Sequence, residues 1–69
     1  MTAASDLAEL STLRATLDDV ALRVEAVADA YRETRNSAVA SDLDGAWRAL
    51  FATRRSIDRA LGTLESLAG

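Results

Sequence analysis

The sequence contains no cysteine, no histidine, no proline and no lysine, and glycine occurs at only three positions. Without cysteine the chain cannot form a disulfide, and without cysteine or histidine it lacks the ligands of ordinary zinc, haem and iron–sulfur sites. A hydroxyl nucleophile would have no imidazole base, and no glycine-rich phosphate-binding loop is present. We therefore expect a protein that is not an enzyme and that holds no metal or other cofactor.

Long apolar runs are absent as well. No segment approaches the roughly 18 apolar residues of a membrane-spanning helix. The first basic residue is Arg14 and polar residues interrupt Leu7 to Leu17, so the front of the chain does not resemble a secretory signal. A helix lying on a membrane surface is disfavoured, because such helices carry basic polar faces and the first half of this chain is acidic. On these grounds we expect a cytoplasmic protein.

With 69 residues, the chain has room for one small domain with a thin core. Ordering costs about 1.5 kcal/mol per residue, which requires roughly 4,000 Å² of apolar burial to offset it. Two helices packed only on each other bury one stripe each and fall short of that area. The sequence therefore predicts association with a second copy, as a homodimer, or with a helical protein partner.

Alanine, leucine and arginine are the commonest residues of the sequence, which predicts an all-α fold. In the first half, apolar residues recur in alternating steps of three and four, as in a heptad seam. Its a positions are Leu10, Leu17, Val24 and Tyr31, and its d positions are Leu13, Val20, Val27 and Thr34.

A second seam follows with the same spacing. Its d positions are Leu43, Leu50, Ile57 and Leu64, and its a positions are Trp47, Arg54, Leu61 and Ala68. The two seams are out of phase, so one continuous helix would point them in different directions. A break between them is therefore required.

We place this break where Asn36 and Ser37, both poor helix-interior residues, precede a capping-box pattern formed by Ser41 and Asp44. Thr2 or Ser5 is the expected cap of the first helix. The prediction is a single domain over 1–69, with helix one at about 4–35, a loop at about 36–41 and helix two at about 42–67.

A short connection makes two long helices antiparallel, so the predicted fold class is an antiparallel helical hairpin. The register that we favour over a one-heptad slip brings Arg14 toward Glu65 and Arg35 toward Asp44. Small residues beside both seams favour two hairpins pairing into a four-helix bundle. A domain-swapped extended dimer would satisfy the same seams between chains, and the loop decides between these forms.

Two aromatic residues one helical turn apart, Trp47 and Phe51, are candidate partner-binding residues, because aromatic anchors dominate interface energies. The alternative that we favour is that both fill the core or the dimer interface. Leu22 falls outside the first seam. If it joined Phe51 in one patch, the pair would form a docking site.

Arginines supply the other candidate contacts. Arg54 interrupts the second seam at an a position, where it could bind an acidic partner, although we expect its guanidinium to reach Asp58 or an acid of another chain. Arg48 and Arg55 extend a locally basic stretch that could contact nucleic acid. We favour a solvated face instead, because helix one is acidic and balances it.

The sequence thus predicts a protein–protein interaction module, a small adaptor, regulator or assembly subunit that acts through a dimerising hairpin. The alternative is a nucleic-acid-associated regulator that uses the arginine-rich face of helix two, although a net charge of −3 makes nucleic acid an unfavoured partner.

Overall fold

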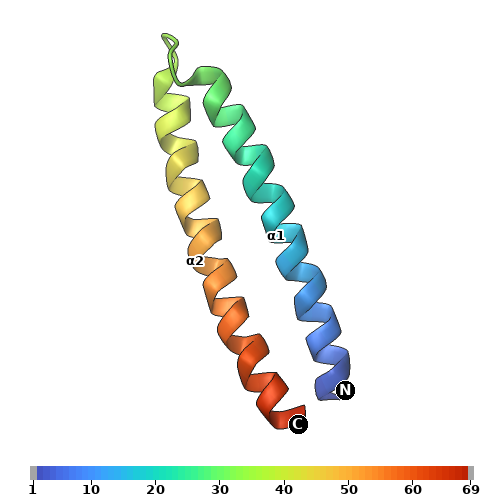
Figure 1. Ribbon diagram of the computed structural model, residues 1–69. Coiled ribbons are helices and arrows are strands. Elements are labelled where there is room, and N and C mark those ends of the chain that lie inside the picture. The colour runs from blue at the N-terminus through green and yellow to red at the C-terminus, as the bar shows by residue number, and fades with distance from the viewer. Residues whose placement is uncertain (1, 69) are drawn as a thin grey trace.

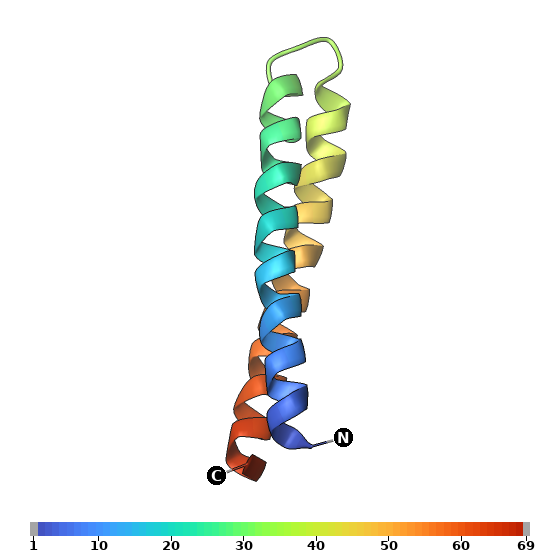
Figure 2. The same ribbon diagram turned by 90° about the vertical axis from the view of Figure 1, so that its right-hand side faces the viewer.

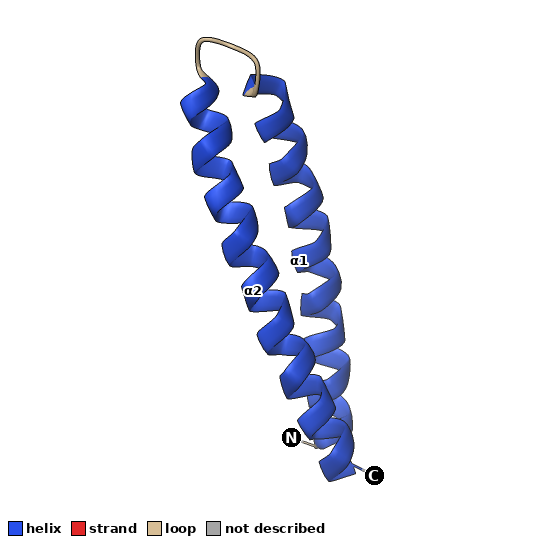
Figure 3. Cartoon of the chain, turned by 60° about the vertical axis from the view of Figure 1, so that its left-hand side comes forward, coloured by secondary structure: helices blue, strands red, loops and turns tan. Residues whose placement is uncertain are grey.

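The computed structural model describes residues 2–68, and over this range the chain folds into two long helices joined by one short loop. Helix α1 spans Ala3–Tyr31 and helix α2 spans Ser37–Ala68. They run antiparallel side by side, with both ends of the chain at the same end of the rod (Figure 1). Figure 3 shows the loop as the one non-helical connection at the far end. The predicted all-α hairpin is confirmed, and it is closed within a single chain.

The hairpin is a rod of 53 × 15 × 14 Å with a radius of gyration of 15.8 Å. A compact domain of this length would have a radius of gyration of about 11 Å. A view turned by 90° shows that the two helices stay together along their whole length and cross toward the termini (Figure 2). Because nothing covers the sides of the pair, most residues remain partly accessible to solvent.

The N-terminus of α1 is capped by Thr2, one of the two residues expected from the sequence. The hydroxyl of Thr2 accepts a hydrogen bond from the backbone N–H of Ser5 at 3.1 Å, and Asp6 adds a negative charge in the first turn. Both features stabilise the exposed N–H groups at the positive end of the helix dipole.

The loop lies earlier than predicted. Helix α1 ends at Tyr31 rather than near residue 35, and α2 begins at Ser37 rather than near residue 42. The hydroxyl of Thr34 donates to the carbonyl of Tyr31 at 2.7 Å and accepts the N–H of Asn36 at 3.2 Å, which closes a turn in place of another helical turn. The predicted capping box is therefore wrong, since Ser41 and Asp44 both lie inside α2.

The second predicted seam is confirmed as the surface that α2 turns toward α1. Its residues from Leu43 to Leu64 are all half-buried, and Ala40, one step before them, is buried. The final position, Ala68, lies outside the residues whose side chains are described. The steps of three and four therefore located the contact surface of α2 correctly.

The first seam is only half correct. Three of its a residues, Leu10, Leu17 and Val24, face α2, but the fourth, Tyr31, is 38% exposed. The d residues Leu13, Val20 and Val27 do not face α2 either, since they are 43, 38 and 49% exposed. Four residues on the other side of the a row contact α2 instead, namely Leu7, Arg14, Ala21 and Ala28. The apolar stripe of α1 is wider than one neighbouring helix can cover, and α2 covers the half that includes the small alanines.

The observed register is the one-heptad slip that the sequence disfavoured. Arg14 pairs with Asp58 at 2.7 Å, seven residues before the expected Glu65. Asp44 pairs with Arg32, not with Arg35. The predicted register was therefore wrong, and the earlier position of the loop is the reason, since an earlier turn moves every residue of α2 relative to α1.

Candidate docking groove and ion pairs

One side of the hairpin carries ion pairs that join the two helices. Near the middle, Arg14 Nε lies 2.7 Å from Asp58 Oδ1, and Arg54 Nε lies 3.2 Å from Asp18 Oδ1. On each helix the arginine and the aspartate are four residues apart. These four residues thus form a square of alternating charges that this register brings together. The prediction that Arg54 reaches Asp58 is not what the structure shows, since its closest acid lies on α1.

The stems of these arginines pack in the interface while their charged ends reach carboxylates. The Nε atoms of Arg14 and Arg54 are hidden from solvent, and each contacts its carboxylate without the alignment of a hydrogen bond. All four side chains remain between a third and a half exposed. The square therefore contributes little net stability, but it opposes registers that place like charges together.

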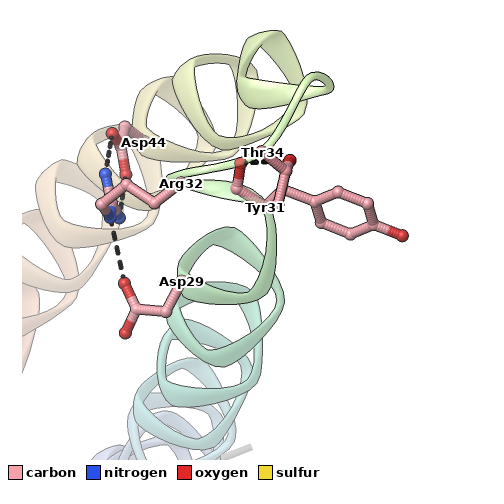
Figure 4. Close-up of polar contacts among 5 residues, drawn as sticks. All are labelled: Asp29, Tyr31, Arg32, Thr34 and Asp44. Atoms are coloured by element: carbon pink, nitrogen blue, oxygen red, sulfur yellow. Dashed lines mark hydrogen bonds and ion pairs between the residues drawn. The ribbon is translucent and has the colours of Figure 1, made fainter.

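A third ion pair joins the helices beside the loop. Both ends of the Arg32 guanidinium donate to the Asp44 carboxylate, at 2.9 and 3.1 Å, while its Nε donates to Asp29 at 3.1 Å (Figure 4). Such a two-pronged contact is more directional than a single charge pair. The Tyr31 ring points away from this cluster, toward the other side of the hairpin.

The Arg32 contact changes the acidity of Asp44. Hydrogen bonds from Arg32 to the carboxylate, together with the attraction of its charge, hold the pKa of Asp44 below its usual value, and Arg48 adds a smaller effect in the same direction. A lowered pKa in the folded state means that the ionised carboxylate stabilises the fold. This stabilisation is complete above about pH 5, where an unfolded aspartate is also almost fully ionised.

We expect the substitution Asp44→Asn to lower the unfolding midpoint at pH 7 slightly, because the amide cannot accept both charge-assisted hydrogen bonds. The difference from the wild-type chain should shrink as the pH falls through the lowered pKa of Asp44 and vanish below it, where Asp44 is neutral as well. Thermal unfolding followed by circular dichroism from pH 7 to pH 2 measures this. Asp42→Asn is the control, because Asp42 lies two residues before Asp44 on the same helix and makes no ion pair among the described residues. A difference that persists at the acid end would contradict the assignment.

Between the charge square and the loop cluster, the two helices leave an open groove of about 280 Å³. It is mainly apolar. Its lining residues are Leu17, Asp18, Ala21, Leu22, Glu25, Trp47, Leu50, Phe51 and Arg54. The groove brings Leu22 and Phe51, which are 66 and 43% exposed, onto one surface, which is the condition that the sequence set for a docking site.

Trp47 and Phe51 are in contact, as their spacing of four residues along α2 predicted. The rings of Trp47 and Phe51 stack with centroids 5.4 Å apart and planes inclined by 13°. Trp47 is half-buried and also lines a smaller cavity of about 200 Å³ next to Ala28, Arg32, Leu43 and Asp44. Trp47 therefore belongs to the contact between the helices, whereas Phe51 presents much of its ring to solvent.

The remaining candidate residues lie beside the aromatic pair. Arg48 and Arg55 are exposed, and neither makes an ion pair within residues 2–68. They lie three residues before and four residues after Phe51, so the three side chains share one face of α2. Of the five predicted partner-binding residues, the structure thus places Trp47, Phe51 and Arg54 in the groove, and helical spacing puts Arg48 and Arg55 beside Phe51 at its edge.

The opposite side of the hairpin is different. Leu22 and Val20 are two residues apart on α1, which at about 100° per residue places them on opposite sides of the helix. On α2 the same relation holds for Phe51 and Thr53. Because Leu22 and Phe51 line one groove, the other two residues lie together on the far side.

We call this far side the uncharged face. On α1 it consists of Leu13, Val20, Val27 and Tyr31, and on α2 of Ala46, Thr53, Ala60 and Leu67, all of them exposed. The hydroxyl of Thr53 donates to the carbonyl of Ala49 at 2.9 Å, so it needs no outside partner. Charge returns at the outer edge, where Arg23 pairs with Asp19 at 3.1 Å, and at the two ends of the face, where the exposed Glu9 and Asp42 lie about five helical turns before Val27 and Ala60. The heptad pattern identified the four α1 residues of this face as apolar seam positions, but the prediction placed them in the contact between the two helices of one hairpin.

In the described part of the chain, neither helix is long and apolar enough to cross a membrane. No group of three or more acidic side chains lies close enough together to hold a metal ion over residues 2–68.

A comparison with protein-family models, curated proteins and solved structures finds no match to this chain. Function is therefore argued from its surfaces.

Proposed function

We propose that the protein is a non-enzymatic interaction module whose hairpins pair through the uncharged face into a homodimeric four-helix bundle. In this role it serves as a small adaptor, regulator or assembly subunit of the cytoplasm. The observation that carries the proposal is the row of Leu13, Val20 and Val27, which repeats every seven residues along α1 and stays exposed beside an uncharged row of α2.

The solvent-exposed surface area of the hairpin supports the proposal, because it exceeds that of a compact monomer by the area that one dimer contact buries. The hairpin exposes 5010 Å². A compact monomer of 7.3 kDa would expose about 4,200 Å², so the hairpin leaves roughly 800 Å² more surface in water. A standard interface buries about 800 Å² on each partner. One dimer contact would therefore remove the excess.

The chemistry of the uncharged face also fits self-association. A two-fold axis brings each residue of a face against the same surface on the other copy, so a face with a charge near its centre would meet like charge. The three ion pairs between the helices all lie on the groove side, and the charged residues of the uncharged face lie at its outer edge and at its two ends, away from its centre. An apolar centre with a polar rim is the usual composition of a homodimer interface.

Molar mass in solution tests this proposal. We expect light scattering during size exclusion to give twice 7.3 kDa at micromolar concentrations, with a decrease toward one chain on dilution. Circular dichroism on the same samples should show helix content that decreases with the mass, because the thin hairpin depends on its partner. A fully helical monomer at every concentration would overturn the proposal.

A further inference from the structure

From the groove and its charged edge we infer a second interaction surface, on the side of the hairpin away from the proposed dimer contact. We propose that this groove binds an amphipathic helix of another protein that carries two acidic residues seven positions apart. The inference extends the proposed role as an interaction module by assigning the chemistry of its partner.

The shape of the groove suits the side chains of a helix. It is open, mainly apolar and about 280 Å³ in volume, just below the roughly 300–1,000 Å³ of pockets that enclose small molecules. Along α2 it extends from Trp47 to Arg54, a length of about 10.5 Å or two helical turns. One or two leucine or aromatic side chains from a partner helix would fill this length. Helices that dock in grooves use such anchors at steps of three and four.

The edge of the groove supplies the charge. Arg48 and Arg55 flank the exposed ring of Phe51 and have no carboxylate within ion-pair distance among the described residues. They are seven residues apart on one helix, about 10.5 Å along its axis. A partner helix that lies in the groove nearly parallel to α2 would place carboxylates seven residues apart at the same spacing. An aromatic residue surrounded by arginines is also the composition that dominates binding in protein interfaces.

A second copy of this chain fits the edge less well. The other acids on the α1 side of the groove are already engaged: Asp18 pairs with Arg54 and Asp29 with Arg32. Of the acids that line the groove, Glu25 alone has no ion pair within residues 2–68. Another copy docked groove to groove would thus offer one free lining carboxylate to the two arginines. A different helix with two acidic residues satisfies both.

A displayed library of helical peptides tests the inference on the full-length chain. The library holds a constant leucine seam and varies the two flanking positions, seven residues apart, among glutamate, glutamine and lysine. We expect selection to enrich glutamate at both positions. Binding of the selected peptide is then measured by the fluorescence of Trp47, the one tryptophan of the sequence, which lines the groove.

Three variants make the result specific. Arg55→Glu and Arg48→Glu should each raise the dissociation constant at least about tenfold, since each loses an attraction and gains a repulsion. Arg35→Glu makes the same charge change in the loop and should leave the constant within about twofold. Molar masses measured in parallel separate this inference from the proposed dimer, because the uncharged face determines the mass and the groove determines peptide binding.

Five results would overturn the inference, and the first four are no enrichment of glutamate, enrichment of lysine, unchanged peptide binding by the Arg55→Glu variant, and salt-sensitive binding of a short DNA duplex that displaces the peptide. The last would assign the arginines to phosphate contacts. A wild-type mass of four chains that falls to two in Arg55→Glu would also overturn it, because another copy would then occupy the groove.

Discussion

Replacing Val20 with glutamate is expected to convert the proposed dimer into single chains at micromolar concentrations. Val20 lies in the middle of the uncharged face and is 38% exposed in the isolated hairpin, so the hairpin tolerates the change while the dimer does not. Two-fold symmetry places two new carboxylates in one interface, and each buried charge without a partner costs several kcal/mol. Since about 1.4 kcal/mol is a factor of ten, the dissociation constant should rise at least about 100-fold.

Leu22→Glu is the matched control for this experiment. It introduces the same side chain on the same helix, two residues further on and on the opposite side, at a residue that is 66% exposed. Its mass should remain that of two chains. If Leu22→Glu dissociates the protein and Val20→Glu does not, the dimer forms through the groove, and both the proposed interface and the inferred helix site are wrong.

The second large effect is expected from Trp47→Ala. Trp47 lines both cavities between the helices and stacks on Phe51, so its removal takes away the largest side chain of the contact. Truncating a fully buried tryptophan costs about 3–5 kcal/mol, and for this half-buried one we expect about 2–3 kcal/mol. For a domain of this size that corresponds to a decrease of roughly 10–20 °C in the unfolding midpoint.

Two related variants separate packing from simple loss of apolar area. Trp47→Phe keeps a ring that can stack and should lose less than half as much stability. Phe51→Ala removes a ring that is 43% exposed, so its midpoint should fall less than that of Trp47→Ala. Thermal unfolding at one fixed protein concentration measures all three, because the midpoint of a dimer depends on concentration. Equal losses for Trp47→Ala and Phe51→Ala would mean that Trp47 is not part of the contact between the helices.

The candidate site could be predicted from the sequence only in part. Trp47 and Phe51 were found because residues four apart on a helix are neighbours whatever the helix packs on. The spacing of Arg48, Phe51 and Arg55 is local in the same sense. The pairing of Arg54 with Asp18 could not be found this way, because it joins residues of two helices and depends on their register.

The register of the two helices was difficult to predict, because surface ion pairs and the heptad repeat are weak indicators of it. Surface ion pairs contribute about 0–1 kcal/mol each, and a heptad repeat is satisfied equally well after a slip of seven residues. The predicted register was chosen because it pairs Arg14 with Glu65 and Arg35 with Asp44. The structure uses Arg14 with Asp58 and Arg32 with Asp44, and adds Arg54 with Asp18. Finding this set required the correct end of α1.

The sequence by itself determined that this protein is an all-α hairpin. It also identified the residues of α2 that face α1 and the residues that form the aromatic and arginine-rich side of the hairpin. These properties follow from helical periodicity, which every residue experiences locally. The tertiary structure alone decided the loop position, the register and which half of the apolar stripe of α1 stays open. The stripe is wider than one neighbouring helix can cover, so only the packed pair shows that Leu13, Val20 and Val27 remain free for a partner.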